Sequence, residues 1–154
     1  TNMKKDSVWS NFGPSGRLSN KETYSEDSLH GKKYIYVVPE DPLDKSQRIS
    51  QILEYNNGSL EGPFISYFMS GRVMKKGNYI NNRMDGIWEE FHPNGKRSIN
   101  ARYKNGVKHG WWVIYDEAQE RIGEVYYCNG QLLNGDKLDR HLELLQEKGL
   151  DPNG

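Results

Sequence analysis

Aromatic, glycine and polar residues recur along the chain at a fixed interval. Gly62, Gly86 and Gly110 are spaced by 24 residues (86 − 62 = 110 − 86), and aromatic residues follow each of them at constant distances. A fixed period between about 20 and 50 residues is the signature of a repeat array, in which each unit packs mainly on its neighbours. The pattern therefore predicts a solenoid of repeats in place of a domain with one central core.

Within a repeat, two short segments of strand character alternate with turn sequences. Ile99, Ala101 and Tyr103 alternate with polar residues, as in a half-buried strand. The segment 92–95 reads His-Pro-Asn-Gly and 105–106 reads Asn-Gly, and both are typical of tight turns. Each repeat is therefore predicted to be a β-hairpin. The fold class that follows is all-β, an elongated single-sheet antiparallel meander of about ten strands.

The repeat register divides most of the chain into five copies. They are residues 7–30, 31–61, 62–85, 86–109 and 110–133. The second copy is longer because of an insertion near 38–47, whose two prolines and charges predict a protruding loop. Residues 1–6 are predicted to be a flexible N-terminus, and 134–154 a C-terminal helix and tail.

The repeating aromatic positions are predicted to form the structural core, because large rings dominate packing energetics. They are Trp9, Phe12, Tyr24, Tyr36, Tyr55, Phe64, Tyr67, Tyr79, Trp88, Phe91, Tyr103, Trp112, Tyr115 and Tyr127. Trp88 and Phe91 are three residues apart, so either a bulge aligns the two rings or one ring packs on each face of the sheet. The glycine that opens each copy is predicted to let a ring from a neighbouring strand lie flat over the backbone.

The residues after the array predict a short helix. Asp136 is the expected cap of a helix that runs to about Lys148, and Gly149 is the expected stop. Such a helix could cover an open sheet edge, which we favour, or it could dock a partner. The tail 150–154 resembles 91–95, either as a common turn sequence, which we favour, or as the start of a further repeat.

Composition and charge narrow the class of function. The chain has 21 basic and 21 acidic residues without a basic block, so it lacks the clustered cations of nucleic-acid-binding proteins. The single Cys128 excludes an internal disulfide. No apolar run reaches the ~18 residues of a membrane span. The cytoplasm is the favoured compartment, with export after removal of a leader as the alternative, because the chain starts at Thr1.

The sequence offers no convergent set of catalytic groups. Glu89 and Glu90 are adjacent on a predicted strand, so they face opposite ways. His30 and His109 occupy equivalent places in copies too far apart to share one metal ion. We therefore expect no catalytic residues, no metal, no cofactor and no enzymatic activity.

The repeated units G-x-W-x-x-F-x-x-N-G-K and Y-K-N-G-x-x-x-G resemble MORN-type repeats, most closely the bacterial variant of YwqK-like antitoxin proteins. The resemblance covers about residues 7–133 and is continuous in register over 62–127. It implies a twisted sheet of stacked hairpins, a MORN-like solenoid, with a non-enzymatic binding role. In the bacterial variant that role is capture of a toxin protein, as part of a toxin–antitoxin system. In other MORN proteins it is attachment to membrane phospholipid or to protein partners.

The candidate partner-binding residues lie beside the repeating core. Trp111 adjoins the repeating Trp112, so alternation along the strand predicts that Trp111 points outward. The full candidate set is Trp111, Tyr126, Pro39, Asp41 and Leu43. The favoured function is a scaffold that binds a protein partner. A phospholipid-binding or membrane-surface module and a carbohydrate-binding module of an exported protein are the alternatives, and the oligomeric state stays open.

Overall fold

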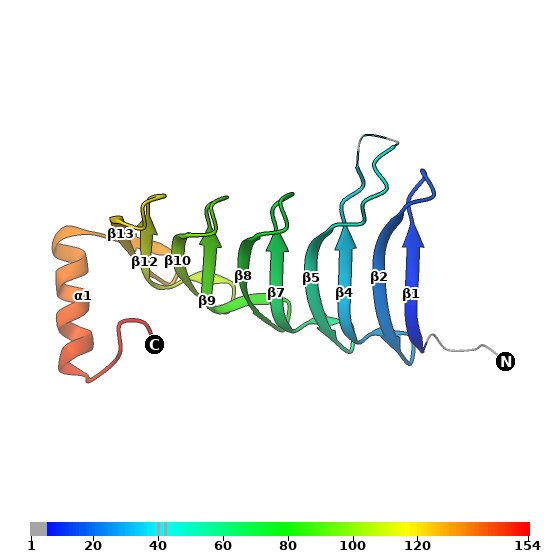
Figure 1. Cartoon of the computed structure of the whole chain (residues 1–154). Coiled ribbons are helices and arrows are strands. Elements are labelled where there is room, and N and C mark those ends of the chain that lie inside the picture. Colours follow the sequence, from blue (N-terminus) through cyan, green and yellow to red (C-terminus); the bar gives the residue numbers. More distant parts are fainter. Residues whose placement is uncertain (1–5, 40, 42) are drawn as a thin grey trace.

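The molecule is one open antiparallel sheet with a single helix at its C-terminal end (Figure 1). The computed structural model describes residues 6–39, 41 and 43–154. The longer strands are β1 (Ser7–Phe12), β2 (Leu18–Ser25), β4 (Gly31–Tyr36), β5 (Ile49–Asn56), β7 (Gly62–Tyr67), β8 (Val73–Ile80), β9 (Arg83–Phe91), β10 (Arg97–Lys104), β12 (Gly110–Tyr115) and β13 (Arg121–Cys128). The short strands are β3 (Ser28–Leu29), β6 (Ser59–Leu60), β11 (Val107–Lys108) and β14 (Gln131–Leu133), and the helix is α1 (Gly135–Glu147).

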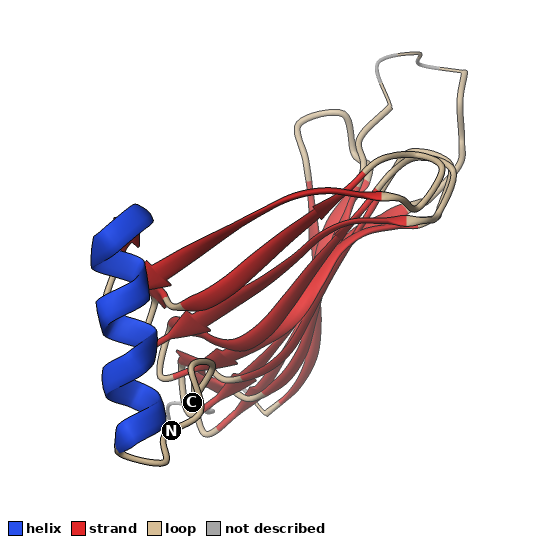
Figure 2. Ribbon diagram, turned by 90° about the vertical axis from the view of Figure 1, so that its left-hand side faces the viewer, coloured by secondary structure: helices blue, strands red, loops and turns tan. Residues whose placement is uncertain are grey.

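The strands follow one another across the sheet in the order of the sequence. The hydrogen-bonded path runs β1-β2-β4-β5-β7-β8-β9-β10-β12-β13-β14, and β3, β6 and β11 pair beside β2, β5 and β10. All of these pairs are antiparallel. A view turned by 90° shows the strands as one twisted layer, with α1 beside one set of strand ends, at the left of the picture (Figure 2). The predicted all-β meander of hairpins is confirmed.

Aromatic rings form a continuous ladder on one face of the sheet, which we call the aromatic face. Successive ring centroids are 5.8, 5.1, 6.1, 5.2 and 5.3 Å apart, all in edge-to-face orientation. This is one of the arrangements that aromatic pairs prefer. The rings in order are Phe64, Tyr79, Trp88, Tyr103, Trp112 and Tyr127. The ladder takes the place of a central core, because each ring packs on a ring of the next strand.

Trp88 is the best-buried ring, and a glycine makes room for it. Only 1% of Trp88 is exposed. A Cβ on Gly77, in the neighbouring strand β8, would lie 2.2 Å from Cδ2 of Trp88. The cross-strand partner on the other side is the small Ala101. Two small neighbours thus let the indole lie against the sheet, and the predicted core position of Trp88 is confirmed.

The glycine that opens each repeat is required for its backbone conformation and not to make room for a ring. Gly62 and Gly86 have φ values of 112° and 72°, which only glycine adopts without strain. A Cβ on Gly86 would meet no atom within 4 Å. The prediction that an aromatic ring covers the opening glycine is therefore wrong. The ring covers Gly77, which lies in the middle of a strand.

Trp88 and Phe91 point to opposite faces of the sheet. Lys75 Nζ lies 5.3 Å from the Trp88 ring centroid, and Lys76 Nζ lies 5.4 Å from that of Phe91. Because Lys75 and Lys76 are neighbours on one strand, they project on opposite sides. Of the two arrangements that the three-residue spacing allows, the structure has one ring on each face.

The aromatic residues of the first strand are not part of the core. Trp9 is 44% exposed and Phe12 is 63% exposed. Among the described residues β1 is the edge of the sheet, so it has a neighbouring strand on one side only. The prediction of a core role is wrong for these two residues. The other predicted core aromatics, from Tyr24 to Tyr127, are buried or half-buried.

Arginine side chains tie successive turns together along one margin of the sheet. Arg48 Nη1 donates to the carbonyl of Met69 at 3.4 Å, and Arg72 Nη1 donates to that of Pro93 at 2.8 Å. Arg17 Nη1 reaches the carbonyl of Pro39 in the same way, at 3.5 Å. These bonds link each turn to the following copy and fix the spacing of the hairpins.

The C-terminal helix is close to its predicted position. α1 begins at Gly135, and its N-cap is Asn134, without a side-chain capping bond. The prediction that Asp136 caps the helix is therefore wrong. Asp136 lies in the first turn, where a carboxylate is favoured by the helix dipole. Gly149 has a φ of 63°, and the N–H of Leu150 donates to the carbonyl of Leu145 at 2.9 Å. This is the Schellman ending that the glycine predicts.

Candidate binding surface

The face opposite the aromatic ladder carries α1, and we call it the helix face. Tyr127 packs on Trp112 in the ladder, so its neighbour Tyr126 points to the helix face. The Tyr126 ring lies 5.5 Å from that of His141 in α1. Its hydroxyl donates to the carbonyl of Pro152 at 2.8 Å and lies 3.2 Å from His141 Nε2. The helix and the tail after it are therefore both anchored at Tyr126.

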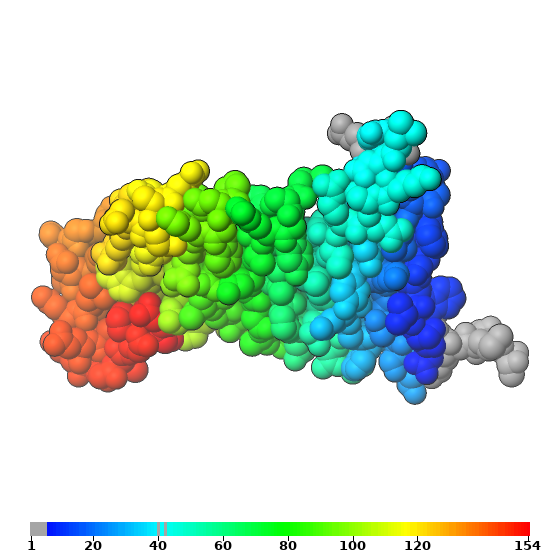
Figure 3. All heavy atoms as spheres, in the orientation of Figure 1, coloured from blue at the N-terminus to red at the C-terminus, as the bar shows by residue number. Residues whose placement is uncertain are grey.

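Trp111 lies on the adjacent strand, and it contacts both Tyr126 and the tail. Its ring centroid is 5.2 Å from that of Tyr126. The backbone N–H of Trp111 donates to Asn153 Oδ1 at 3.3 Å. Arg102 Nη1 donates to the carbonyl of Asn153, also at 3.3 Å. The tail thus lies over β10 and β12 and contacts both backbone and side chains, as a bound peptide would; Figure 3 shows it (red) against the yellow-green part of the sheet.

Trp111 and Tyr126 are not the exposed contacts that the sequence predicts. Tyr126 is only 1% exposed and Trp111 is half-buried. Burial raises the pKa of the Tyr126 hydroxyl, which keeps this hydrogen-bond donor protonated. Alternation along β12 correctly separates Trp111 from Trp112. It carries no information about α1 and the tail, which cover the outward side.

The positions equivalent to Trp111 in the two preceding repeats are open. Ile87 lies one period before Trp111 (111 − 24) and Pro63 lies two periods before it (87 − 24). Ile87 is 49% exposed, and Pro63 is exposed as well. A groove of about 390 Å³ lies between them, lined by Pro63, Phe64, Ile65, Lys76, Gly77, Ile87 and Glu89. We call it the central groove.

Charged side chains border the central groove. Glu89 is paired with Lys76 at 2.8 Å and with Arg97 at 2.5 Å. Burial by itself would raise the pKa of Glu89, but the hydrogen bonds and charges of Lys76 and Arg97 outweigh burial and lower it. The carboxylate is therefore ionised at neutral pH. An apolar floor with a polar border is the usual anatomy of a binding hot spot.

The central groove was not predicted from the sequence, although two signals for it are present. The 24-residue offset from Trp111 points to Ile87, and a second offset of 24 residues points to Pro63. Neither signal says which side of the sheet is covered. That depends on where α1 and the tail lie.

The insertion loop projects beyond the other turns of its margin (Figure 1). Leu43 is 85% exposed, Asp41 is exposed and Pro39 is half-buried. Arg17 holds the base of the loop through the carbonyls of Pro39 and Asp41, at 3.5 and 3.3 Å. Residues 40 and 42 lie outside the described residues. Leu43 and Asp41 are thus accessible, and their role in binding stays a prediction.

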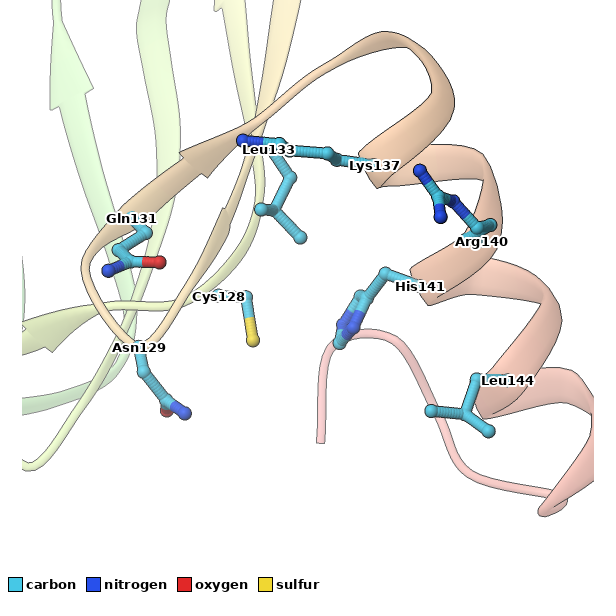
Figure 4. Close-up of a pocket in the computed structure, with 8 residues that line it drawn as sticks. All are labelled: Cys128, Asn129, Gln131, Leu133, Lys137, Arg140, His141 and Leu144. Carbon is cyan, nitrogen blue, oxygen red and sulfur yellow. The ribbon is translucent and has the colours of Figure 1, made fainter.

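A second groove, of about 790 Å³, opens between α1 and the β13–β14 hairpin (Figure 4). The helix contributes Lys137, Arg140, His141 and Leu144, and the hairpin contributes Cys128, Asn129, Gln131 and Leu133. Two of these side chains are cationic and none is a carboxylate. The groove could therefore accept an anionic group.

The described residues provide little for catalysis or metal binding. No cluster of three or more His, Cys, Asp or Glu that could hold a metal ion occurs in the described part of the chain. Glu89 and Glu90 pair with Lys76 and Lys75 on opposite faces, so they cannot act together on one bond. Nor does any described helix have the length and apolar character required to cross a membrane.

Comparison with known proteins identifies no family. No family model matches the chain, and no curated protein matches it. Among solved structures, the chain is similar to one in the "Crystal structure of GtfA/B complex bound to UDP and GlcNAc", with a TM-score of 0.29 and 10% sequence identity. The match covers 94% of this chain and 27% of that one. A TM-score this low supports no inference about fold or function.

Proposed function

We propose that the chain is a non-enzymatic repeat scaffold that binds a protein partner on its helix face, with Ile87 and the central groove as the anchor. One observation carries the proposal. On the following repeat, this face already binds a polypeptide segment, because the tail and α1 cover Trp111 and Tyr126. The equivalent surface around Ile87 is exposed.

The chemistry of the central groove favours a polypeptide with an apolar anchor residue. Such a residue would contact Pro63, Ile65 and Ile87, whereas the fixed charges of Glu89 and Arg97 would meet polar groups at the border. Buried apolar anchors within a polar rim contribute most of the binding energy at protein interfaces. The tail meets the neighbouring repeat in a related way, with Asn153 hydrogen-bonded and Pro152 close to Tyr126.

The resemblance to YwqK-like antitoxin proteins supports a narrower version of the proposal. In that version the partner is a toxin protein, and binding along the sheet neutralises it. The open sheet supports this role because its strands offer a long continuous face (Figure 1). The balanced charge of the chain gives no electrostatic preference for an acidic or a basic toxin.

Site-specific photo-crosslinking tests the position of the partner. A photo-reactive amino acid at position 87 should crosslink a protein from the source cells, whereas the same group at position 122 should not. Ile122 is a matched control because it is also an exposed isoleucine of a strand. With the crosslinked protein purified, Ile87→Arg should weaken its Kd roughly fivefold to thirtyfold, as expected for an anchor worth about 1–2 kcal/mol. Equal affinity of Ile87→Arg and Ile122→Arg would contradict the proposal.

A phospholipid headgroup is the second candidate ligand, because Lys137 and Arg140 line the groove beneath α1 without a carboxylate. The zero net charge argues against strong attachment to anionic membranes. Co-sedimentation with phosphatidylserine vesicles separates the two proposals. Binding that is lost in Lys137→Glu/Arg140→Glu and kept in Ile87→Arg would favour the lipid. The carbohydrate-binding alternative has less support at its nominated platform, because Trp111 is half-buried and its ring packs on that of Tyr126.

A further inference from the structure

Asn-Gly peptides occur six times in the chain, and the structure does not hold them all in the same way. They are the pairs 57–58, 94–95, 105–106, 129–130, 134–135 and 153–154, and all of them lie within the described residues. An asparagine side chain reacts most readily with the backbone when glycine follows it, because glycine lacks a Cβ and leaves its own nitrogen accessible. The conformation at each pair therefore decides where this chemistry can occur.

In five of the six pairs the glycine nitrogen is held in a hydrogen bond. Gly58, Gly106 and Gly130 donate to carbonyls of the preceding repeat, each at 2.8 Å. The asparagines before them have φ values of 46°, 52° and 47°, the left-handed conformation of a tight turn. Gly95 and Gly154 donate to the carbonyl three residues earlier, at 2.8 and 3.0 Å. Each of these nitrogens must lose its hydrogen bond before it can approach the side chain of the preceding asparagine.

The pair Asn134–Gly135, between β14 and α1, is the exception. Asn134 is extended, with a φ of −151° and a ψ of 165°, and its exposed side chain makes no capping bond. Gly135 is the first residue of α1, so its N–H has no partner within the helix. In the part of the chain that the structure describes, this N–H donates to no other acceptor, and a Cβ on Gly135 would meet no atom within 4 Å. Both reacting groups are therefore free, and water can reach them.

We propose that Asn134 is a site of spontaneous deamidation through a succinimide. The Gly135 nitrogen attacks the side-chain carbonyl carbon of Asn134. The bond from that carbon to the side-chain nitrogen breaks, and ammonia leaves with the proton of the backbone amide. Water then opens the succinimide ring at either carbonyl and gives aspartate or isoaspartate. The reaction needs water alone as a co-reactant, and the inference does not depend on the proposed function.

The modification changes the junction between the sheet and the helix. Aspartate is as good an N-cap as asparagine, and the helix dipole favours its negative charge, so the aspartate form should keep α1 intact. The isoaspartate form instead has an extra methylene in the backbone just before α1. Either product adds a negative charge three residues before Lys137, which lines the groove beneath α1 together with Arg140. Deamidation therefore makes this end of the molecule more acidic.

Peptide mapping by mass spectrometry tests the proposal on the unmodified chain. During incubation of the folded protein at mildly alkaline pH, Asn134 should deamidate roughly tenfold faster than any other asparagine of the six pairs. Loss of one well-formed hydrogen bond corresponds to a factor of about this size. In guanidinium chloride the turns are absent, so all six asparagines should react at similar rates, and this is the internal control. Equal rates in the folded chain, or a faster reaction at another asparagine, would overturn the proposal.

Two variants give an independent readout by isoelectric focusing. The folded chain should accumulate a more acidic isoform during the incubation, and Asn134→Ser should remove most of it. Asn129→Ser is the matched control and should leave the isoform unchanged, since Asn129 also precedes a glycine and is also exposed. Persistence of the isoform in Asn134→Ser, or its loss in Asn129→Ser, would contradict the assignment. If a variant fails to fold by circular dichroism, peptide mapping of the unmodified chain still decides the question.

Discussion

The column of residues that holds Phe64, Trp88 and Trp112 in the last three repeats holds Lys33 in the second repeat. In the later repeats the column belongs to the aromatic ladder, and Trp88 is almost completely buried. In the second repeat Lys33 Nζ instead lies 2.6 Å from Glu22 Oε1, and both side chains are largely covered. The same backbone position is thus filled by ring packing in the last three repeats and by an ion pair in the second.

Further hydrogen bonds hold the Glu22 carboxylate in the second-repeat ion pair. Glu22 also accepts from the Tyr24 hydroxyl at 3.0 Å and from Asn11 Nδ2 at 3.1 Å. The hydrogen bond from Lys33, with those from Tyr24 and Asn11, lowers the pKa of Glu22. Burial alone would lower the pKa of Lys33, but its bond to Glu22 outweighs burial and raises it. The carboxylate is therefore satisfied in its half-buried site.

The difference teaches how a repeat array distributes its stability. Each repeat contacts mainly its neighbours, so one column can change chemistry without altering the backbone. Ring packing stabilises the fold through apolar burial and edge-to-face contacts. In a covered ion pair, the attraction between the charges is largely offset by the free energy needed to remove them from water. We therefore expect the ladder of β7–β13 to be more stable than the polar region of β1–β4.

Truncation of Trp88, the central ring of the ladder, should reduce the stability of the chain more than any other change considered. Trp88→Ala should cost about 3–5 kcal/mol of unfolding free energy, because it removes a buried indole and leaves a cavity. For a chain of this length, Tm should fall by roughly 6–20 °C in a thermal melt. The exposed Trp9→Ala should cost less than about 1 kcal/mol. Similar losses for the two variants would show that the ladder is not the source of stability.

Filling the space under the ring should have the next largest effect. Gly77→Ala places a Cβ where the Trp88 ring lies, and overpacking of this kind costs about 1–3 kcal/mol in urea unfolding. In the Trp88→Ala background the same change should cost much less, because the ring is gone. Gly123→Ala is a suitable control, since its Cβ would meet Ile114 at an ordinary 4.0 Å. Additive costs of Gly77→Ala and Trp88→Ala would argue against direct packing.

Replacing the Glu22–Lys33 ion pair with apolar residues tests whether the aromatic ladder can extend into the second repeat. Lys33→Met alone leaves the Glu22 carboxylate without its cation and should destabilise the chain by about 1–2 kcal/mol. Glu22→Val with Lys33→Trp extends the ladder and should recover that loss, or even add stability, because apolar packing can replace a covered ion pair. Urea unfolding of both variants measures the difference. A double variant less stable than Lys33→Met would mean that the ladder cannot extend into the second repeat.

Acid should have the smallest effect. Loss of the Glu22 charge should lower the free energy of unfolding by about 1 kcal/mol or less. The pKa of Glu22 is lowered from 4.5, so its contribution is complete above about 4.5 and is lost as the pH falls through the folded-state pKa. The pKa of Lys33 is raised from 10.5, so its contribution is lost only as the pH rises above that value. The stability difference between the unmodified chain and Glu22→Gln should therefore be full at neutral pH and vanish in acid. A difference independent of pH would show that the charge of Glu22 does not matter.

Part of the candidate site could be read from local pattern. Alternation on β12 places Trp111 opposite Trp112, and this is correct because the direction of neighbouring side chains is a property of the strand itself. The exposure of Leu43 also follows from its place in an insertion. The central groove could not be read in this way, because Ile87 is available only where the tail and α1 do not reach.

The sequence by itself determined the hairpin meander, the burial of Trp88 and the glycine stop of α1, because turn chemistry and aromatic spacing act within a single repeat. Only the tertiary structure decided that Gly77, and not Gly86, lies under the indole, since this depends on a register shift between β8 and β9. It also decided that the Tyr126 hydroxyl donates to the carbonyl of Pro152 and that Trp9, on the outermost of the described strands, is partly exposed. These outcomes depend on contacts between segments far apart in the chain, and a local period cannot specify which distant segment covers which face.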